Sequence, residues 1–211
     1  MTDDLLHTPQ QGRSRETLTR ILEATEALMA QKPFEKITVA ELVRAAKTTT
    51  GSFYARFPDK SSLLAALHQG HLEEMSMRID GQVEEISKGS PRERIEKIVA
   101  IMGDEFGSRP ALMRSGTLHF WNQNVSNDAM MESAIRHKTY RDKLLVLLEL
   151  TAKELGNKKP KEAANFILKV LLSSSRQHYL FTDQRTVLVV NQEEFKRDQI
   201  SMAYAYLKYG E

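Results

Sequence analysis

Residues 38–60 read TVAELVRAAKTTTGSFYARFPDK, and this stretch predicts two short helices joined by a tight turn. Thr38 and Glu41 have the spacing of a capping box, in which each side chain binds the backbone amide of the other residue. The run Lys47–Thr50 breaks the apolar helical pattern, because threonines are poor inside helices but good at their starts. Pro58 ends the second helix, since the residue before a proline avoids the helical region.

Two short helices separated by such a turn form a helix-turn-helix, whose second helix fits the major groove of DNA. The second helix is expected to run from Gly51 to Arg56. Asp59 is placed to cap a longer third helix that has Lys60 in its first turn.

The same stretch resembles the TetR family of bacterial transcriptional regulators. The family's running pattern of Ser/Thr, any residue, Gly, Thr/Ser, an apolar residue, Tyr, two variable residues, Phe and then Lys is reproduced in order by Thr49, Gly51, Ser52, Phe53, Tyr54, Phe57 and Lys60. Further matches are Ile21, Leu22, Ala24, Ala27, Phe34, Thr38, Ala46 and Leu63. The resemblance covers about the first 65 to 70 residues.

The resemblance implies a set of residues that contact DNA in the second helix and around it. Hydroxyl groups and a glycine that permits close backbone approach are expected to face the groove, and Tyr54, Arg56 and Lys60 to face phosphates. Phe53 is expected in the core. The complete predicted DNA-binding set is Thr38, Thr48, Thr49, Thr50, Gly51, Ser52, Tyr54, Arg56 and Lys60. The family usually has glycine where this chain has Lys47, and a left-handed backbone there costs a lysine about 1 kcal/mol.

Composition limits the class of protein. The chain has 211 residues, 41% of them hydrophobic, and no cysteine, which excludes disulfides and thiolate metal sites. Its net charge is +2, and residues 1–60 hold nine Lys/Arg against eight Asp/Glu, so attraction to DNA must come from individually placed contacts. The polar start lacks a signal core, and no apolar run reaches the ~18 residues that span a bilayer. We therefore expect a cytoplasmic protein without a membrane partner.

Periodicity predicts an all-α fold, with an N-terminal three-helix DNA-binding head joined to a larger C-terminal helical bundle. The expected divisions are a disordered tail over 1–12, the helix-turn-helix domain over 13–60 and a ligand-binding and dimerisation domain over 61–211. Later helices are expected from Asp59, from Pro91 behind the Ser90–Glu93 capping box, from Pro110, over 128–155, from Pro160 to about 181, and from Asn191 to about 208. Residues 186–190 are strand-like and are interpreted as an extended connector.

The resemblance also implies a small-molecule pocket among the C-terminal helices, where polar and aromatic residues gather. Pockets of this kind are largely apolar and contain a few orienting polar groups. The predicted ligand-binding residues are Phe106, Met113, Phe120, Trp121, Tyr140, Leu144 and His178.

The family forms dimers through its last two helices. In this chain the helix from Pro160 carries small residues that permit close approach, namely Ala163, Ala164, Ser173, Ser174 and Ser175. The last helix carries Tyr204, Tyr206, Leu207 and Tyr209 on more than one face, more aromatic surface than one buried stripe requires. A homodimer through these two helices is therefore expected.

No enzyme motif is present, and no cofactor or metal is expected. The sequence lacks a phosphate-cradling glycine-rich loop, a Gly-x-Ser-x-Gly elbow and a His-Glu-x-x-His motif. His68 and His71, three apart on one helix, could ligate a metal but are interpreted as ordinary surface or core histidines. The function predicted is a ligand-responsive transcriptional repressor that binds a pseudo-palindromic operator as a dimer. The alternatives are a DNA-binding protein of the same fold without an effector, or an all-helical enzyme or metal-binding bundle.

Overall fold

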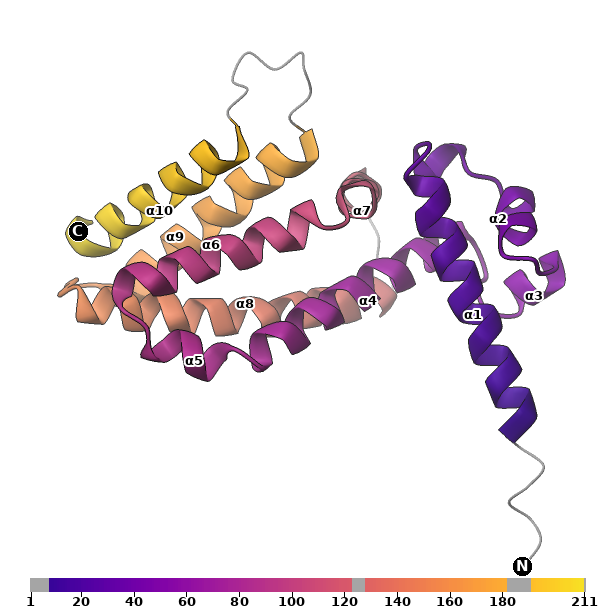
Figure 1. Cartoon of the computed structure of the whole chain (residues 1–211), viewed down its shortest axis with the longest axis horizontal. Helices are drawn as coiled ribbons and strands as arrows, with labels where there is room; N and C mark the ends of the chain where they lie inside the picture. The colour runs from indigo at the N-terminus through magenta and orange to yellow at the C-terminus, as the bar shows by residue number, and fades with distance from the viewer. Residues whose placement is uncertain (1–7, 123–127, 182–190, 211) are drawn as a thin grey trace, which may run out of the picture. The chain divides into compact units, whose positions relative to one another are not determined.

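The computed structural model describes residues 8–122, 128–181 and 191–210, and these residues are helical apart from short turns (Figure 1). Side chains are described for these residues except those of 8–13, 120–122, 128–137 and 139. The expected break over 123–127 and the strand-like patch at 186–190 lie outside the described part. Within it, no helix is long and apolar enough to cross a bilayer, and no group of three or more His, Asp or Glu side chains is placed to hold a metal ion.

The chain divides into two compact units. The first extends to His68 and also includes the segment from Ser115, and the second comprises the remaining described residues. The expected boundary after residue 60 therefore falls near the start of a helix, α4, that contributes to both units. The first unit contains α1 (Thr8–Met29), the 3-10 turn η1 (Phe34–Lys36), α2 (Val39–Ala45), α3 (Thr50–Tyr54) and the start of α4 (Lys60–Asp80).

The expected tail over 1–12 is wrong in its extent, because α1 begins at Thr8. The sequence signal was weak there, since Thr8–Arg13 offers no apolar periodicity. The core of the first unit is assembled from α1, α2, α3 and α4. Its most deeply buried side chains are Ile21, Leu42, Phe53, Leu63 and Leu64, each 0% exposed.

The second unit is a helical bundle. It contains the end of α4, α5 (Val83–Lys88), α6 (Pro91–Gly107), the start of α7 (Pro110–Asn122), α8 (Asp128–Glu154), α9 (Pro160–Arg176), the π-helical turn η2 (Gln177–Phe181) and α10 (Gln192–Tyr209). The short helix α5 was not predicted. Ser90 caps α6 through the expected capping box with Glu93, and Asn191 caps α10 by accepting from the amide of Glu194 at 2.9 Å.

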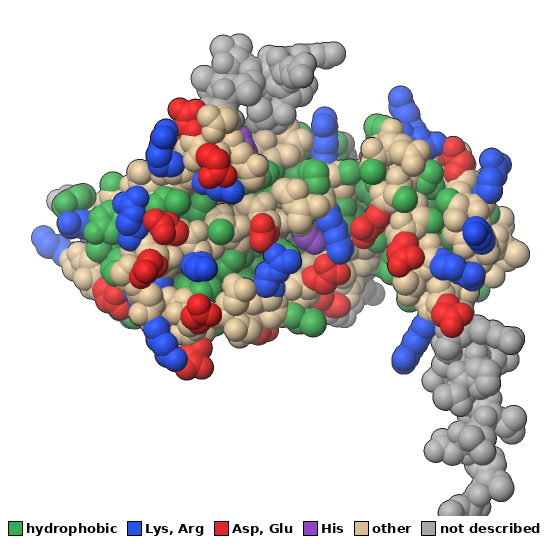
Figure 2. Space-filling view, in the orientation of Figure 1, with side chains coloured by type: hydrophobic (Ala, Val, Ile, Leu, Met, Phe, Trp, Pro, Cys, Tyr) green, Lys and Arg blue, Asp and Glu red, His purple; other side chains and the backbone are tan. Residues whose placement is uncertain are grey.

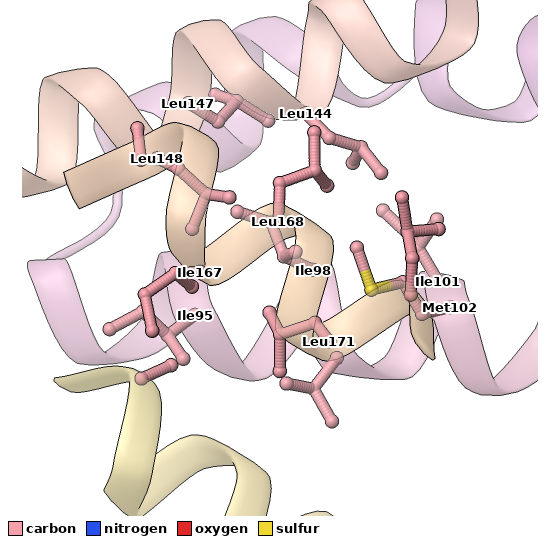
Figure 3. Packing of buried hydrophobic residues seen from close by; sticks show 14 of the residues in the cluster. Ile95, Ile98, Ile101, Met102, Leu144, Leu147, Leu148, Ile167, Leu168 and Leu171 are labelled. Carbon is pink, nitrogen blue, oxygen red and sulfur yellow. The ribbon is translucent and has the colours of Figure 1, made fainter. Parts of the chain in front are cut away.

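Three helices meet at the centre of this bundle. Figure 3 shows side chains of α6, α8 and α9 converging, among them Ile98, Leu144 and Leu171, all 0% exposed. The small residues of α9 contribute to this packing: Ala163, Ala164 and Ser175 are buried within the chain. The expectation that these three permit close approach of a second subunit is wrong, because they allow helices of the same chain to approach instead.

His68 and His71 are buried, at 5% and 1% exposure. The Nε2 atom of His71 lies 2.8 Å from the backbone carbonyl oxygen of Glu105, within the second unit. Their interpretation as core histidines fits this burial.

Candidate nucleic-acid interface and effector site

The turn between α2 and α3 closes α2 with a Schellman motif. The amide of Thr48 donates to the carbonyl of Val43 at 2.9 Å, and the amide of Lys47 donates to the carbonyl of Arg44 at 3.2 Å. Lys47 has φ 49, the left-handed conformation that glycine adopts without strain. The position where the family usually has glycine thus has a left-handed backbone in this chain, and the turn keeps its geometry with lysine there.

Capping interactions fix the start of both helices of the motif. Thr38 accepts from the amide of Glu41 at 3.2 Å, and Glu41 accepts from the amide of Thr38 at 2.8 Å. Lys32 approaches Glu41 at 2.5 Å, and together with Thr38 it holds the pKa of the Glu41 carboxyl down at about 2. At α3, Thr49 accepts from the amide of Ser52 at 3.1 Å. Thr38 and Thr49 thus have structural roles in addition to the DNA contacts predicted for them.

The short helix α3 has one buried and one exposed side. Phe53 is 0% exposed and packs edge-to-face on Tyr54, with ring centroids 5.3 Å apart, which confirms its expected place in the core. Thr50 and Gly51 are exposed, and Tyr54 is 54% exposed. A Cβ atom built on Gly51 would meet only the Thr49 hydroxyl, at 3.9 Å, so nothing in the described chain requires glycine at this position.

The two predicted basic contacts are already engaged within the first unit. Arg56 donates to the carbonyl of Ser52 at 2.7 Å and to the hydroxyl of Ser14 at 3.1 Å, which ties α3 to α1. Lys60 donates to the carbonyls of Phe34 and Glu35 at 3.0 and 3.3 Å. Burial lowers the pKa of Lys60. Each side chain has further donors, so these contacts leave room for phosphate.

The predicted effector residues fall into three groups. Phe106, Met113, Tyr140 and Leu144 are at most 2% exposed and belong to the core of the second unit. His178 lies on η2 and stacks on Phe195 of α10, with ring centroids 3.9 Å apart, and burial lowers its pKa. Phe120 and Trp121 lie on α7, and their side chains are outside the described part of the structure.

One titratable group in this core was missed from the sequence. Glu105 of α6 is 0% exposed, and both carboxyl oxygens lack a hydrogen bond among the described residues. Burial raises the pKa of Glu105 to about 7, against smaller lowering effects of Tyr140, Arg141 and Arg176. The burial of Tyr140, with Glu105 beside it, raises the pKa of Tyr140 well above its usual value. The available signal was that Glu105 falls at i+3 from Met102, on the apolar stripe of α6.

Comparison with known proteins agrees with this geometry. The fold and its Schellman turn define a helix-turn-helix protein, and the sequence profile described as "Bacterial regulatory proteins, tetR family" matches residues 21–67. A curated relative, the HTH-type transcriptional regulator EthR of Mycolicibacterium smegmatis, is 31% identical over 97 residues, which is 46% of this chain and 44% of that protein. The match thus spans less than half the length of that relative.

Similar solved structures extend over nearly the whole chain. A FadR regulator from Bacillus subtilis, crystallised with stearoyl-CoA, has a TM-score of 0.66 at 15% identity and covers 92% of this chain and 98% of its own. A regulator from Pseudomonas aeruginosa has a TM-score of 0.64 at 20% identity, and the match covers 92% of this chain and 90% of that chain. These likenesses concern the fold. The sequence likeness to the TetR family of bacterial regulatory proteins rests on residues 21–67.

Proposed function

We propose that this protein is a transcriptional repressor that binds a pseudo-palindromic operator as a homodimer and releases it when a small molecule binds the second unit. The observation that carries the DNA-binding part is the polarity of α3. Phe53 anchors the helix from inside, while Thr50, Gly51 and Tyr54 face outward. A helix anchored on one side and polar and small on the other suits the major groove.

The phosphate contacts are assigned to Tyr54, Arg56 and Lys60, and the base-facing contacts to Thr48, Thr50, Gly51 and Ser52. Arg56 is held by a carbonyl oxygen of α3 and Lys60 by carbonyl oxygens of η1, so both charges stay in fixed positions. Pre-positioned charges lose little conformational entropy on binding, which supports contact with phosphates.

Dimerisation is assigned to the exposed faces of α9 and α10. Phe166 of α9 is 48% exposed and stacks on Tyr206 of α10, with ring centroids 4.5 Å apart. Met202 and Tyr209 of α10 are 38% and 72% exposed. Figure 2 shows hydrophobic side chains between the charged ones over the region of α9 and α10. A two-fold dimer through this surface would bury these side chains and present two α3 helices to two half-sites.

The effector is assigned to the core of the second unit around Tyr140. Phe106, Met113 and Leu144 would contact an apolar part of the ligand, and Tyr140 would orient it. The FadR structure from Bacillus subtilis holds stearoyl-CoA, so acyl-CoA thioesters are one class of compound to test as effectors. Release requires a ligand that binds the DNA-free state more tightly, because equal affinity for both states shifts nothing.

The test of this function has two stages. DNA bound by the purified full-length chain is first selected from a random pool, and compounds are then screened for release of the selected operator. Trp121, the single tryptophan, serves as an optical reporter of effector binding. Tyr140→Phe should weaken the effector while leaving operator affinity unchanged. Purified protein that enriches no DNA sequence would overturn the proposal.

A further inference from the structure

A shallow cavity of about 350 Å³, open to solvent, lies between α8 and α9, and none of the effector residues assigned above lines it. This volume is at the lower end of the range for small-molecule sites. Its lining includes three cationic side chains, Arg141 of α8 and Lys169 and Arg176 of α9. Leu168 and Leu172, each 7% exposed, form its apolar part. Figure 3 shows Leu168 of α9 among the buried side chains that α6 and α8 also contribute.

The three cations of this cavity are not held in ion pairs by the described carboxylates. Among the described residues, no ion pair joins Arg141, Lys169 or Arg176 to a carboxylate. Arg94 of the same bundle provides the contrast, since its buried guanidinium donates to the carbonyl of Ser87 at 2.8 Å and pairs with Glu154. Arginine that is buried for stability alone is ordinarily paired in this way.

Arg141 also differs from Arg94 in its hydrogen bonds. Its Nε atom is buried and has no hydrogen-bond partner among the described residues. Glu105 interacts electrostatically with Arg141 and Arg176, and burial raises the pKa of Glu105 to about 7. Even when ionised, Glu105 carries one negative charge against the three positive charges. The cavity therefore retains a net positive charge.

We propose that this cavity binds the carboxylate or phosphate group of a small amphipathic anion, with Arg141 and Arg176 as donors and Lys169 as the third charge. Guanidinium groups suit both oxyanions because they donate two parallel hydrogen bonds. Leu168 and Leu172 would contact the apolar part of the ligand. A bound anion would also relieve the mutual repulsion of the three cations. Binding is independent of the proposed function, whereas a role of this anion as effector rests on it.

Calorimetric titration of the full-length protein tests the site with three probes of one chain length: octanoate, octyl phosphate and the neutral octanol. At least one anion should bind tenfold or more tightly than octanol, and the preferred one identifies the headgroup. Arg141→Met and Arg176→Gln should each weaken that anion about tenfold. Lys161→Gln is the matched control, because Lys161 is an exposed cation of α9 that does not line the cavity.

Two results would overturn the site. The first is equal binding of the anions and octanol, or equal binding by wild type and both arginine variants. The second is a change in sedimentation of the arginine variants without a change in anion affinity, which would mean that the cations pair with a second copy of the chain. Operator binding measured in parallel separates the two proposals. An anion that binds the cavity without affecting operator affinity leaves the site intact and removes only its effector role.

Discussion

The ammonium group of Lys60 lies 4.8 Å from the centroid of the Phe34 ring and donates to the Phe34 carbonyl at 3.0 Å. The lysine that the family pattern assigns to DNA therefore also closes the η1 turn. Lys60→Ala should lower the free energy of unfolding by about 1 kcal/mol, since a charged hydrogen bond and a cation–π contact are lost.

The same variant tests the phosphate contact. Loss of one phosphate contact lowers the slope of log affinity against log salt by about one and weakens all DNA sequences similarly. Urea unfolding and operator binding at several salt concentrations measure the two effects separately. A reduced stability with an unchanged slope would restrict Lys60 to its structural role.

Gly51→Ala should separate folding from DNA binding. The added Cβ has room, and alanine is favoured over glycine in helices, so stability should stay equal or rise by up to about 1 kcal/mol. Operator affinity should fall at least tenfold if the backbone of Gly51 approaches DNA closely. Gly70→Ala in α4 is the control, because a Cβ atom there meets nothing within 4 Å and the variant should leave operator affinity unchanged. Equal operator affinity for wild type and Gly51→Ala would show that the backbone of Gly51 does not approach DNA closely.

Lys47→Gly should raise the free energy of unfolding by about 0.5 to 1 kcal/mol. Glycine relieves the left-handed backbone at φ 49, an effect partly offset by the greater freedom of glycine in the unfolded chain. Lys36→Gly, at an exposed residue of η1 without a positive φ, should destabilise the protein. A loss of stability for Lys47→Gly would show that the left-handed conformation carries little strain here.

Glu105→Gln should change how stability depends on pH. The pKa of Glu105 is about 7 in the folded protein against 4.5 as its reference, so the folded state retains the proton more strongly. The stabilising effect of the protonated carboxyl is complete below pH 4.5 and is lost as the pH rises through 7. The free energy of unfolding should therefore change by about 3 kcal/mol across this range, since one pKa unit corresponds to about 1.36 kcal/mol. Glutamine removes this term, so the variant should gain on wild type in urea unfolding between pH 5 and pH 8.

The other titratable groups around Glu105 set the background for that measurement. They are Tyr140 and Arg141 from α8, Arg176 from α9, and His71 from α4 at the backbone carbonyl. His71→Gln serves as a second variant, because His71 Nε2 lies 2.8 Å from the backbone carbonyl oxygen of Glu105. Parallel pH curves for wild type and Glu105→Gln would contradict the assigned pKa.

Local signals predicted the elements more reliably than their packing partners. The capping boxes of Thr38 and Ser90 follow from short-range spacing, and the structure contains both. The burial of Ala163 and Ala164 could not be predicted, because small residues serve close packing within a chain and between chains alike. The short α5 was missed since six residues give too little periodicity.

The candidate sites show the same contrast between features that a local sequence pattern predicts and features that depend on packing. The exposed side of α3 follows from the position of Phe53 in the family pattern. The cavity of Arg141 and Arg176 could not be predicted, because these residues are 35 apart in sequence and meet only when α8 packs on α9. The burial of Glu105 had a weak sequence signal, because its carboxylate falls on the apolar stripe of α6.

Selection of bound DNA from a random pool by the full-length protein tests the central claim most directly. The account predicts an enriched sequence made of two inverted half-sites, bound by a dimer, with enrichment lost for Gly51→Ala and kept for Gly70→Ala. Enrichment of no sequence, or of a single asymmetric site bound equally by both variants, would contradict it.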